Sequence, residues 1–266
     1  MYFSQKALNE MMEAREAISG KYESLLMMYV MLPLENATAK EYATQGFPRR
    51  LGMMAHCIHN VFTTLPPEKG DIPSKTQLFD ATVNIQAFLV NAFGCIDNLA
   101  RIWVHERPVT KKGGKPLPNG HIGLAVHHTK VRTSLSQSFQ DYLKTIDKWL
   151  TFMGNFRHAL AHRIPLYIPP YAVRPEDETA YREFEQKMIE ASKSGELAEH
   201  GRLATEQQKL VRFLPWIQHS YLEKAEPAVF HPQLLADFKI IEELGLKMHG
   251  ELEALYLSYG DSLQNP

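Results

Sequence analysis

The stretch FLVNAFGCIDNLARIWV, residues 88–104, decides the fold of this chain. Its apolar side chains recur at nearly all angles around a helical axis, and the same pattern extends over residues 76–106. A helix that is apolar on almost every face has to be buried on all of them. The sequence therefore predicts a central helix at 76–106, with other helices packed around it.

Other segments carry the three-to-four-residue apolar spacing of helices, and several are closed by prolines. They are residues 4–32, 48–64, 139–162 and 232–259, with a short helix expected near 122–131. This pattern predicts an all-α protein. We expect the long helices 4–32, 76–106, 139–162 and 232–259 to form an antiparallel helical bundle.

Residues 164–231 interrupt the helical pattern. Prolines cluster at the start of this segment, in IPLYIPPYAVRP (164–175), and exclude a helix there. We expect a polar helix over 176–194, a break over 195–204 and extended chain over 210–230. The segment is too polar to bury a core of its own. One domain spanning residues 1–266, with an irregular proline-rich insert at about 164–231, is therefore expected.

Composition narrows the class of protein. The 266 residues are 44% hydrophobic and 22% charged, which is ordinary for a globular chain. The net charge of −1 argues against a general duplex-binding protein but leaves room for a local basic site. Cys57 and Cys95 lie in apolar contexts and are expected to be reduced. We expect no apolar run long enough to span a bilayer, and the first residues lack a signal-peptide pattern, so we expect a cytoplasmic protein without membrane contact.

The segment with the most evident chemistry is NFRHALAHRIP, residues 155–165, late in the expected helix 139–162. Arg157 and His162 are five positions apart, so their side chains lie roughly 140° apart around a helix. Both are long enough to converge on one small anion. An arginine can bind phosphate oxygens with two N–H groups, and a histidine can move a proton near neutral pH. Such a pair can cleave RNA without a metal.

The same residues have plainer explanations. Cations in the last turn of a helix interact favourably with its unpaired carbonyl groups. Similar spacings also join Arg50 to His56 and Arg212 to His219, but only the 157–162 pair falls late in a long helix. His158 and His162 have the i,i+4 spacing of a metal pair, yet a third ligand and the glutamate of an HExxH motif are missing. We expect no metal and no cofactor.

The run Arg157-His158-Ala159-Leu160-Ala161-His162 resembles the signature of HEPN domains (higher eukaryotes and prokaryotes nucleotide-binding). In that signature a polar residue follows the arginine, as His158 does here, and a histidine comes after apolar spacing. A second similarity is FGCIDNLA (93–100), which places the carboxylate of Asp97 and the amide of Asn98 on a preceding apolar helix. The resemblance covers about residues 76–165. The long first helix and the insert resemble the larger HEPN-like bacterial proteins.

This resemblance implies a function and a set of site residues. It implies a HEPN-like bundle and a metal-independent endoribonuclease in which Arg157 and His162 are catalytic, with His158, Asp97 and Asn98 in support. HEPN ribonucleases build composite sites from two subunits, so a homodimer is expected. The implied biological role is that of a toxin or antiphage defence effector, which would have an antitoxin as partner.

Two alternatives stay open. The chain can instead be a non-catalytic HEPN-like module that binds RNA, a nucleotide or a protein, because its charge is ordinary and the insert is large enough to cover a cleft. Asp97 also has two interpretations: an i,i+4 ion pair with Arg101 on its own helix, or a carboxylate that holds Arg157 in place.

Overall fold

The computed structural model describes residues 2–220, 222 and 226–264, and side chains as far as residue 257. Helices dominate, which confirms the all-α class. They are α1 Gln5–Glu16, α2 Ile18–Val30, α3 Ala37–Glu41, α4 Phe47–Thr64, α5 Lys75–Glu106, α6 Thr129–Arg132, α7 Gln137–Thr145, α8 Asp147–His162, α9 Glu178–Lys193, α10 Leu197–Gln208 and α11 Phe230–Gln264, with a π turn at Tyr42–Gly46 and 3-10 turns at Asn119–His121 and Pro175–Asp177. The strands are β1 Ala172–Val173, β2 Val211–Arg212, β3 Trp216–Ile217 and β4 Ala228–Val229.

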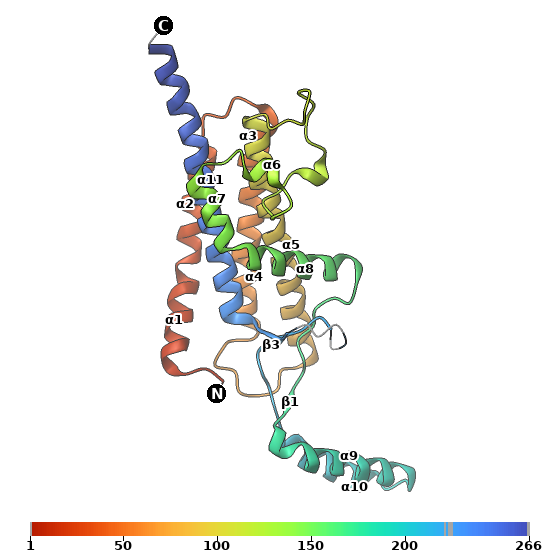
Figure 1. Ribbon diagram of the computed structural model, residues 1–266. Helices are drawn as coiled ribbons and strands as arrows, with labels where there is room; N and C mark the ends of the chain where they lie inside the picture. Colours follow the sequence, from red (N-terminus) through yellow and green to blue (C-terminus); the bar gives the residue numbers. More distant parts are fainter. Residues whose placement is uncertain (1, 221, 223–225, 265–266) are drawn as a thin grey trace.

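α5 is the central helix, as its all-round apolar pattern predicts (Figure 1). Ser74 and Gln77 cap its start reciprocally, because each side chain accepts a hydrogen bond from the backbone N–H of the other residue. Over residues 92–104 its side chains are buried or half-buried on every face, Trp103 among them, whereas Phe79, Val83 and Val90 nearer its start are exposed. α4 covers α5 most extensively, and α11, α8 and α3 cover other parts of its surface.

The bundle around α5 differs from the expected one in membership and in direction. α4 and α11 pack against α5, and α2 packs against both of them. α4 thus holds the place that the sequence assigned to residues 139–162. α2, α5 and α11 run in one direction and α4 runs back (Figure 1). The expected antiparallel arrangement is therefore wrong for α11, because the long connection from α5 returns the chain to the end where α5 began.

Residues 139–162 form two helices instead of one. α7 ends at Thr145 and α8 begins at Asp147, with Ile146 between them at φ −103° and ψ 7°. The Asp147 carboxylate lies 2.7 Å from a guanidinium nitrogen of Arg132, and an acidic residue in a first turn favours a helix start. α8 consequently crosses α5 instead of continuing along α7 (Figure 1).

Two smaller differences concern the other expected helices. The expected helix 4–32 is divided at Ala17, which lies between α1 and α2. Of the expected helix 122–131, only α6 forms. Residues 122–128 make a compact loop in which the His128 ring covers Gly123 so closely that a Cβ there would lie 2.5 Å from it.

Close approach between helices depends on Gly245 of α11. The buried Tyr29 hydroxyl of α2 donates a 2.8 Å hydrogen bond to the Gly245 carbonyl. A Cβ at Gly245 would lie 3.0 Å from the Phe47 ring and 3.2 Å from a methyl group of Leu25. Glycine therefore lets α2, α4 and α11 meet at one level of the core.

The insert is more regular than expected. β1 pairs antiparallel with β2, and β3 pairs antiparallel with β4, so the chain leaves the bundle and returns along the same path. Between β1 and β2, α9 and α10 form a helical hairpin that projects from the bundle (Figure 1). The expected break at 195–204 is wrong: only the turn around Gly195, whose φ is +77°, interrupts the helices. Residues 221 and 223–225 of the expected extended stretch lie outside the described residues.

α5 also corrects the expectation about apolar length. By length and composition it can cross a membrane, although the sequence was expected to hold no such run. In the structure 44% of its most apolar window is buried within the protein. A core helix passes the same test, so one helix of this kind is weak evidence for a membrane span.

The core contains two buried ionisable side chains, Asp237 and His231, whose pKa values are shifted in opposite directions. Asp237 on α11 is fully buried, and its Oδ1 accepts hydrogen bonds of 2.7 Å from the Trp149 indole and from the Gln233 amide. Its Oδ2 has no partner within the described residues, and burial raises the pKa of this carboxyl to about 6. Burial lowers the pKa of His231 to about 4, although its ring donates to the Leu65 carbonyl.

The buried Asp237 predicts a pH-dependent effect of Asp237→Asn. A carboxyl with a raised folded-state pKa favours folding at low pH and loses that contribution as pH rises from about 4 to about 6. At pH 8 the free energy of unfolding of the variant should exceed that of the wild type by up to about 3 kcal/mol. At pH 4 the two should nearly agree.

Urea denaturation at both pH values measures this difference. Asp80→Asn, on an exposed position of α5, is the matched control. A variant at Asp237 that is less stable than the wild type at pH 8 would contradict the assignment of an unfavourable buried charge.

Candidate functional site

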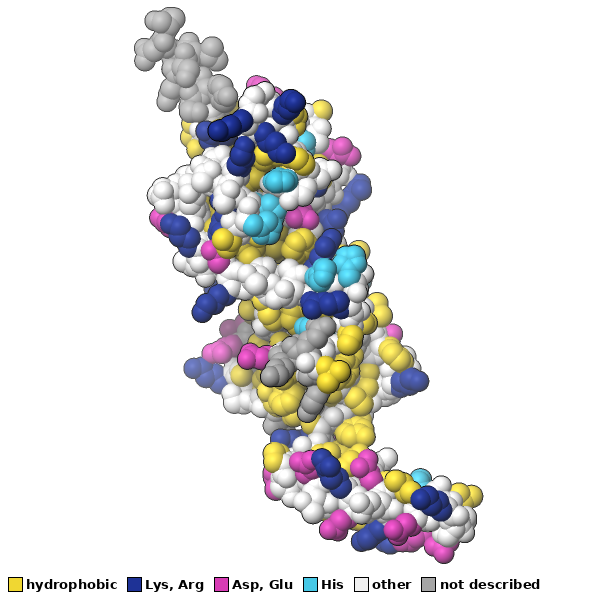
Figure 2. Space-filling model, turned by 45° about the vertical axis from the view of Figure 1, so that its right-hand side comes forward, with side chains coloured by type: hydrophobic (Ala, Val, Ile, Leu, Met, Phe, Trp, Pro, Cys, Tyr) yellow, Lys and Arg dark blue, Asp and Glu magenta, His cyan; other side chains and the backbone are white. Residues whose placement is uncertain are grey.

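The last two turns of α8 present a cationic patch to solvent. Arg157, His158 and His162 are exposed, whereas Met153, Phe156 and Ala159 of the same helix are buried. The expected placement late in a helix, with the apolar stripe turned inward, therefore agrees with the structure. Figure 2 shows histidine and Lys or Arg side chains gathered on the face of the bundle above the projecting hairpin.

His158 and His162 lie next to each other. Their ring centroids are 5.1 Å apart, as i,i+4 spacing brings two side chains together on one helix. A single chain thus supplies two adjacent imidazoles. One can accept a proton while the other donates one, which is the pair of tasks that phosphodiester cleavage requires.

Arg157 is positioned by α5. Its guanidinium carbon lies 5.4 Å from the centre of the Phe93 ring, a cation–π distance. The same ring lies beside Gly154, three residues earlier on α8, where a Cβ would make an ordinary van der Waals contact of 4.0 Å with it. Phe93 precedes Asp97 by one helical turn. α5 and α8 pack against each other, so Asp97 and the 157–162 segment lie on neighbouring helices.

Asp97 lies within reach of three arginines. Burial raises the pKa of this half-buried carboxyl, and the positive charges of Arg101, Arg157 and Arg50 oppose the rise, in that order of effect. Among the described residues neither Arg101 nor Arg157 forms an ion pair with Asp97 within 4 Å: Arg101 donates to the Asn119 side chain, and Arg157 lies over Phe93. Their charges act on the carboxyl from a greater distance, that of Arg101 more strongly.

Arg50 is the member of this group that the sequence did not single out. It comes from α4, and its guanidinium donates to the Asn91 side chain over 3.5 Å. It fills the space beside Gly94, where a Cβ would lie 2.4 Å from a guanidinium nitrogen. A glycine inside an otherwise apolar helix marks such a close approach, and Gly94 is the signal in the sequence that pointed to it.

Asn98 does not join the exposed patch. It is buried, and its amide packs against Gly46 in the π turn, where a Cβ would be 2.9 Å from the amide nitrogen. One residue along a helix turns the side chain by about 100°, which separates Asn98 from Asp97. The role of Asn98 beside Arg157 is thus not supported by its position.

Metal-ligand chemistry finds little support in the side chains. Among the described residues no group of three or more His, Cys, Asp and Glu side chains is arranged to hold a metal ion. Cys57 and Cys95 are buried, and burial raises the pKa of the Cys57 thiol to about 11.

Comparison with protein families, with curated proteins and with solved structures gives no match for this chain.

The three arginines that act on Asp97 predict how strongly each substitution should change the pKa of its carboxyl. Replacing Arg101, Arg157 or Arg50 by glutamine should raise the pKa of Asp97 further in each case, most for Arg101 and least for Arg50. Carboxyl-detected NMR titration of the folded variants measures each value. Arg49→Gln is the control, because Arg49 on α4 is exposed and donates to the Gln45 side chain of the π turn. An unchanged pKa in Arg157→Gln would contradict the placement of Arg157 beside Asp97.

Proposed function

We propose that this protein is a metal-independent endoribonuclease of HEPN type that acts through Arg157 and His162. The observation that carries the proposal is the exposed patch itself: the last two turns of α8 expose an arginine and two adjacent imidazoles. The HEPN-like character of the bundle is part of the same proposal. Cleavage of cellular RNA is what a toxin or antiphage defence effector would do.

The two imidazoles divide the proton transfers of one displacement. One of His158 and His162 takes the proton of a ribose 2′-OH, and the 2′-oxygen then attacks the adjacent phosphorus. The bond from phosphorus to the 5′-oxygen breaks, and the other imidazolium protonates that oxygen. The products are a 2′,3′-cyclic phosphate and a 5′-hydroxyl end.

Arg157 stabilises the charge that develops on the phosphorane. A guanidinium stays protonated throughout the physiological range and can donate two parallel N–H bonds to phosphate oxygens. Its stacking on Phe93 holds it at the edge of α8 without burying its N–H groups. Asp97 restrains the same arginine from a distance through charge, so it acts as a positioning residue.

Single-stranded RNA fits this surface best. The patch is exposed and lies on a helix end, where a flexible strand can bring its 2′-OH into line with the leaving oxygen. The insert does not shield the patch, because Arg157, His158 and His162 all remain exposed beside it. A covered cleft, the motive for a purely non-catalytic module, therefore finds no support in these residues.

The proposal includes a homodimer with a composite site. An open patch on one chain contacts a bound phosphate from one side only. Two patches that face each other across a two-fold axis would enclose it. Each chain would then contribute Arg157, His158 and His162. Binding of RNA without cleavage, the alternative function, would need the same surface.

The proposal predicts which substitutions stop cleavage. Arg157→Ala and His162→Ala should each lower the rate on single-stranded RNA by at least about 100-fold, the usual effect of losing a proton-transfer or charge-stabilising group. EDTA should have no effect on the wild type. The measurement is digestion of end-labelled RNA by purified protein.

Matched controls are available on α4. His56 and Arg49 are exposed there, and His56→Ala and Arg49→Ala should cleave as the wild type does. If RNA binds but is not cleaved by the wild type, and Arg157→Ala weakens binding, the non-catalytic function replaces this one. Activity that EDTA abolishes would contradict the proposed chemistry.

A composite site predicts complementation between inactive variants. Arg157→Ala and His162→Ala chains, mixed after subunit exchange, form heterodimers in which each chain supplies the group that the other lacks. Partial activity should return in the mixture and not in either variant alone. The absence of any recovery, with subunit exchange demonstrated, would show that the site is complete within one chain.

A further inference from the structure

The α9–α10 hairpin has almost no core of its own. α9 buries Ala191 and α10 buries Leu203, and their other residues are half-buried or exposed. The hairpin projects from the bundle, which therefore does not cover it (Figure 1). Ile189 is 54% exposed and Leu197 is 77% exposed. Isolated helices of this length are marginal in water. An apolar partner would supply the burial that the hairpin lacks.

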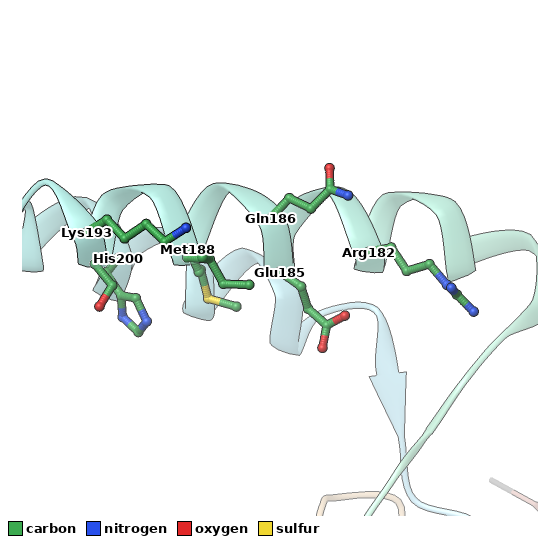
Figure 3. Close-up of a pocket in the computed structure, with 8 residues that line it drawn as sticks. Arg182, Glu185, Gln186, Met188, Lys193 and His200 are labelled. Carbon is green, nitrogen blue, oxygen red and sulfur yellow. The ribbon is translucent and has the colours of Figure 1, made fainter.

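One face of α9 forms a groove of about 650 Å³. Figure 3 shows its wall: Arg182, Glu185, Gln186 and Lys193 come from α9, and His200 comes from α10. The residues of α9 recur at three-to-four spacing, so they form one continuous stripe. Ile189 lies at the middle of this stripe, with polar and charged residues on both sides of it.

The charges of this stripe are self-complementary. In an antiparallel pair of identical helices, residues whose numbers add to a constant face each other. An axis through Ile189 therefore places Ile189 against its counterpart and Glu185 against the partner's Lys193, twice over by symmetry. Gln186 faces the partner's Ser192 in the same way. A parallel pair would instead oppose Glu185 to its own copy and Lys193 to its own copy, which is repulsive.

We propose that α9 is a homodimerisation surface, on which a second copy of this chain packs antiparallel about a two-fold axis at Ile189. The apolar contact at the axis is flanked by two Glu185–Lys193 ion pairs, and both of these side chains are exposed in the single chain. The surface is self-complementary, as a two-fold interface requires. It lies on the projecting hairpin and not on α8, so it is a second contact between copies, separate from the facing α8 patches of the proposed cleavage site.

Charge reversal tests the antiparallel register. Glu185→Lys and Lys193→Glu each turn two attractions into two repulsions and should weaken self-association at least about tenfold. An equimolar mixture of the two variants should associate as heterodimers, since every opposed pair is then of opposite sign. The double variant Glu185→Lys/Lys193→Glu should self-associate as the wild type does. Sedimentation equilibrium measures all four, with circular dichroism to establish that each is folded.

A cross-link tests the position of the axis. In Ile189→Cys the two new thiols should face each other and form an intermolecular disulfide under mild oxidation. Cys57 and Cys95 are buried and give little background. Glu183→Cys, exposed on another side of α9, is the control and should cross-link at least about tenfold less.

The outcomes separate the alternatives. Heterodimers of the two single variants, together with the disulfide at position 189, would support the proposal. A wild type that stays monomeric at 200 µM, or a mixture that associates no better than its components, would overturn it. Because Ile189→Cys leaves Arg157 and His162 in place, RNA cleavage by this variant reports on the proposed function separately.

Discussion

Burial of the C-terminal half of α5 is the constraint on which the rest of the structure depends. Over residues 92–104 its side chains are buried or half-buried on every face, and each large apolar side chain returned to water would cost roughly 1.5–3 kcal/mol. α4, α11, α3 and α8 are the elements that meet this requirement. α2 then closes the bundle by packing on α4 and α11, through the hydrogen bond from Tyr29 to Gly245.

The candidate site is a consequence of this burial. α5 carries Asp97 in its apolar pattern, and a half-buried carboxylate has to be compensated by positive charge. Arg101 comes from α5 itself, Arg50 from α4 and Arg157 from α8, so the helices that cover α5 also supply the compensation. Phe93 fixes Arg157 by its ring. The exposed histidines follow because α8 continues past α5 into solvent before it ends at His162.

The sequence was most informative where a single physical signal dominated. The all-round apolar run predicted α5 nearly to the residue, and the helical stripe with a proline stop predicted the end of α8. Prediction from the sequence failed where contacts between distant residues determine a helix boundary or the partner of a side chain. α8 begins at Asp147, which forms an ion pair with Arg132 of α6. The apolar spacing of residues 139–162 does not reveal that ion pair, so the break at Ile146 was not predicted. α10 forms in a polar stretch because α9 lies beside it, and Asn98 faces Gly46 because of a π turn that no periodicity predicts.

We propose above all that the Arg157–His162 patch cleaves RNA by attack of the 2′-OH, with the protein's own side chains moving the protons. Mass spectrometry of the ends left on a synthetic single-stranded RNA tests that claim most directly. The account predicts 2′,3′-cyclic phosphate and 5′-hydroxyl ends in the presence of EDTA, and an intact strand when the nucleotides are 2′-deoxy. Ends with a 3′-hydroxyl and a 5′-phosphate, or cleavage of the 2′-deoxy strand, would contradict it.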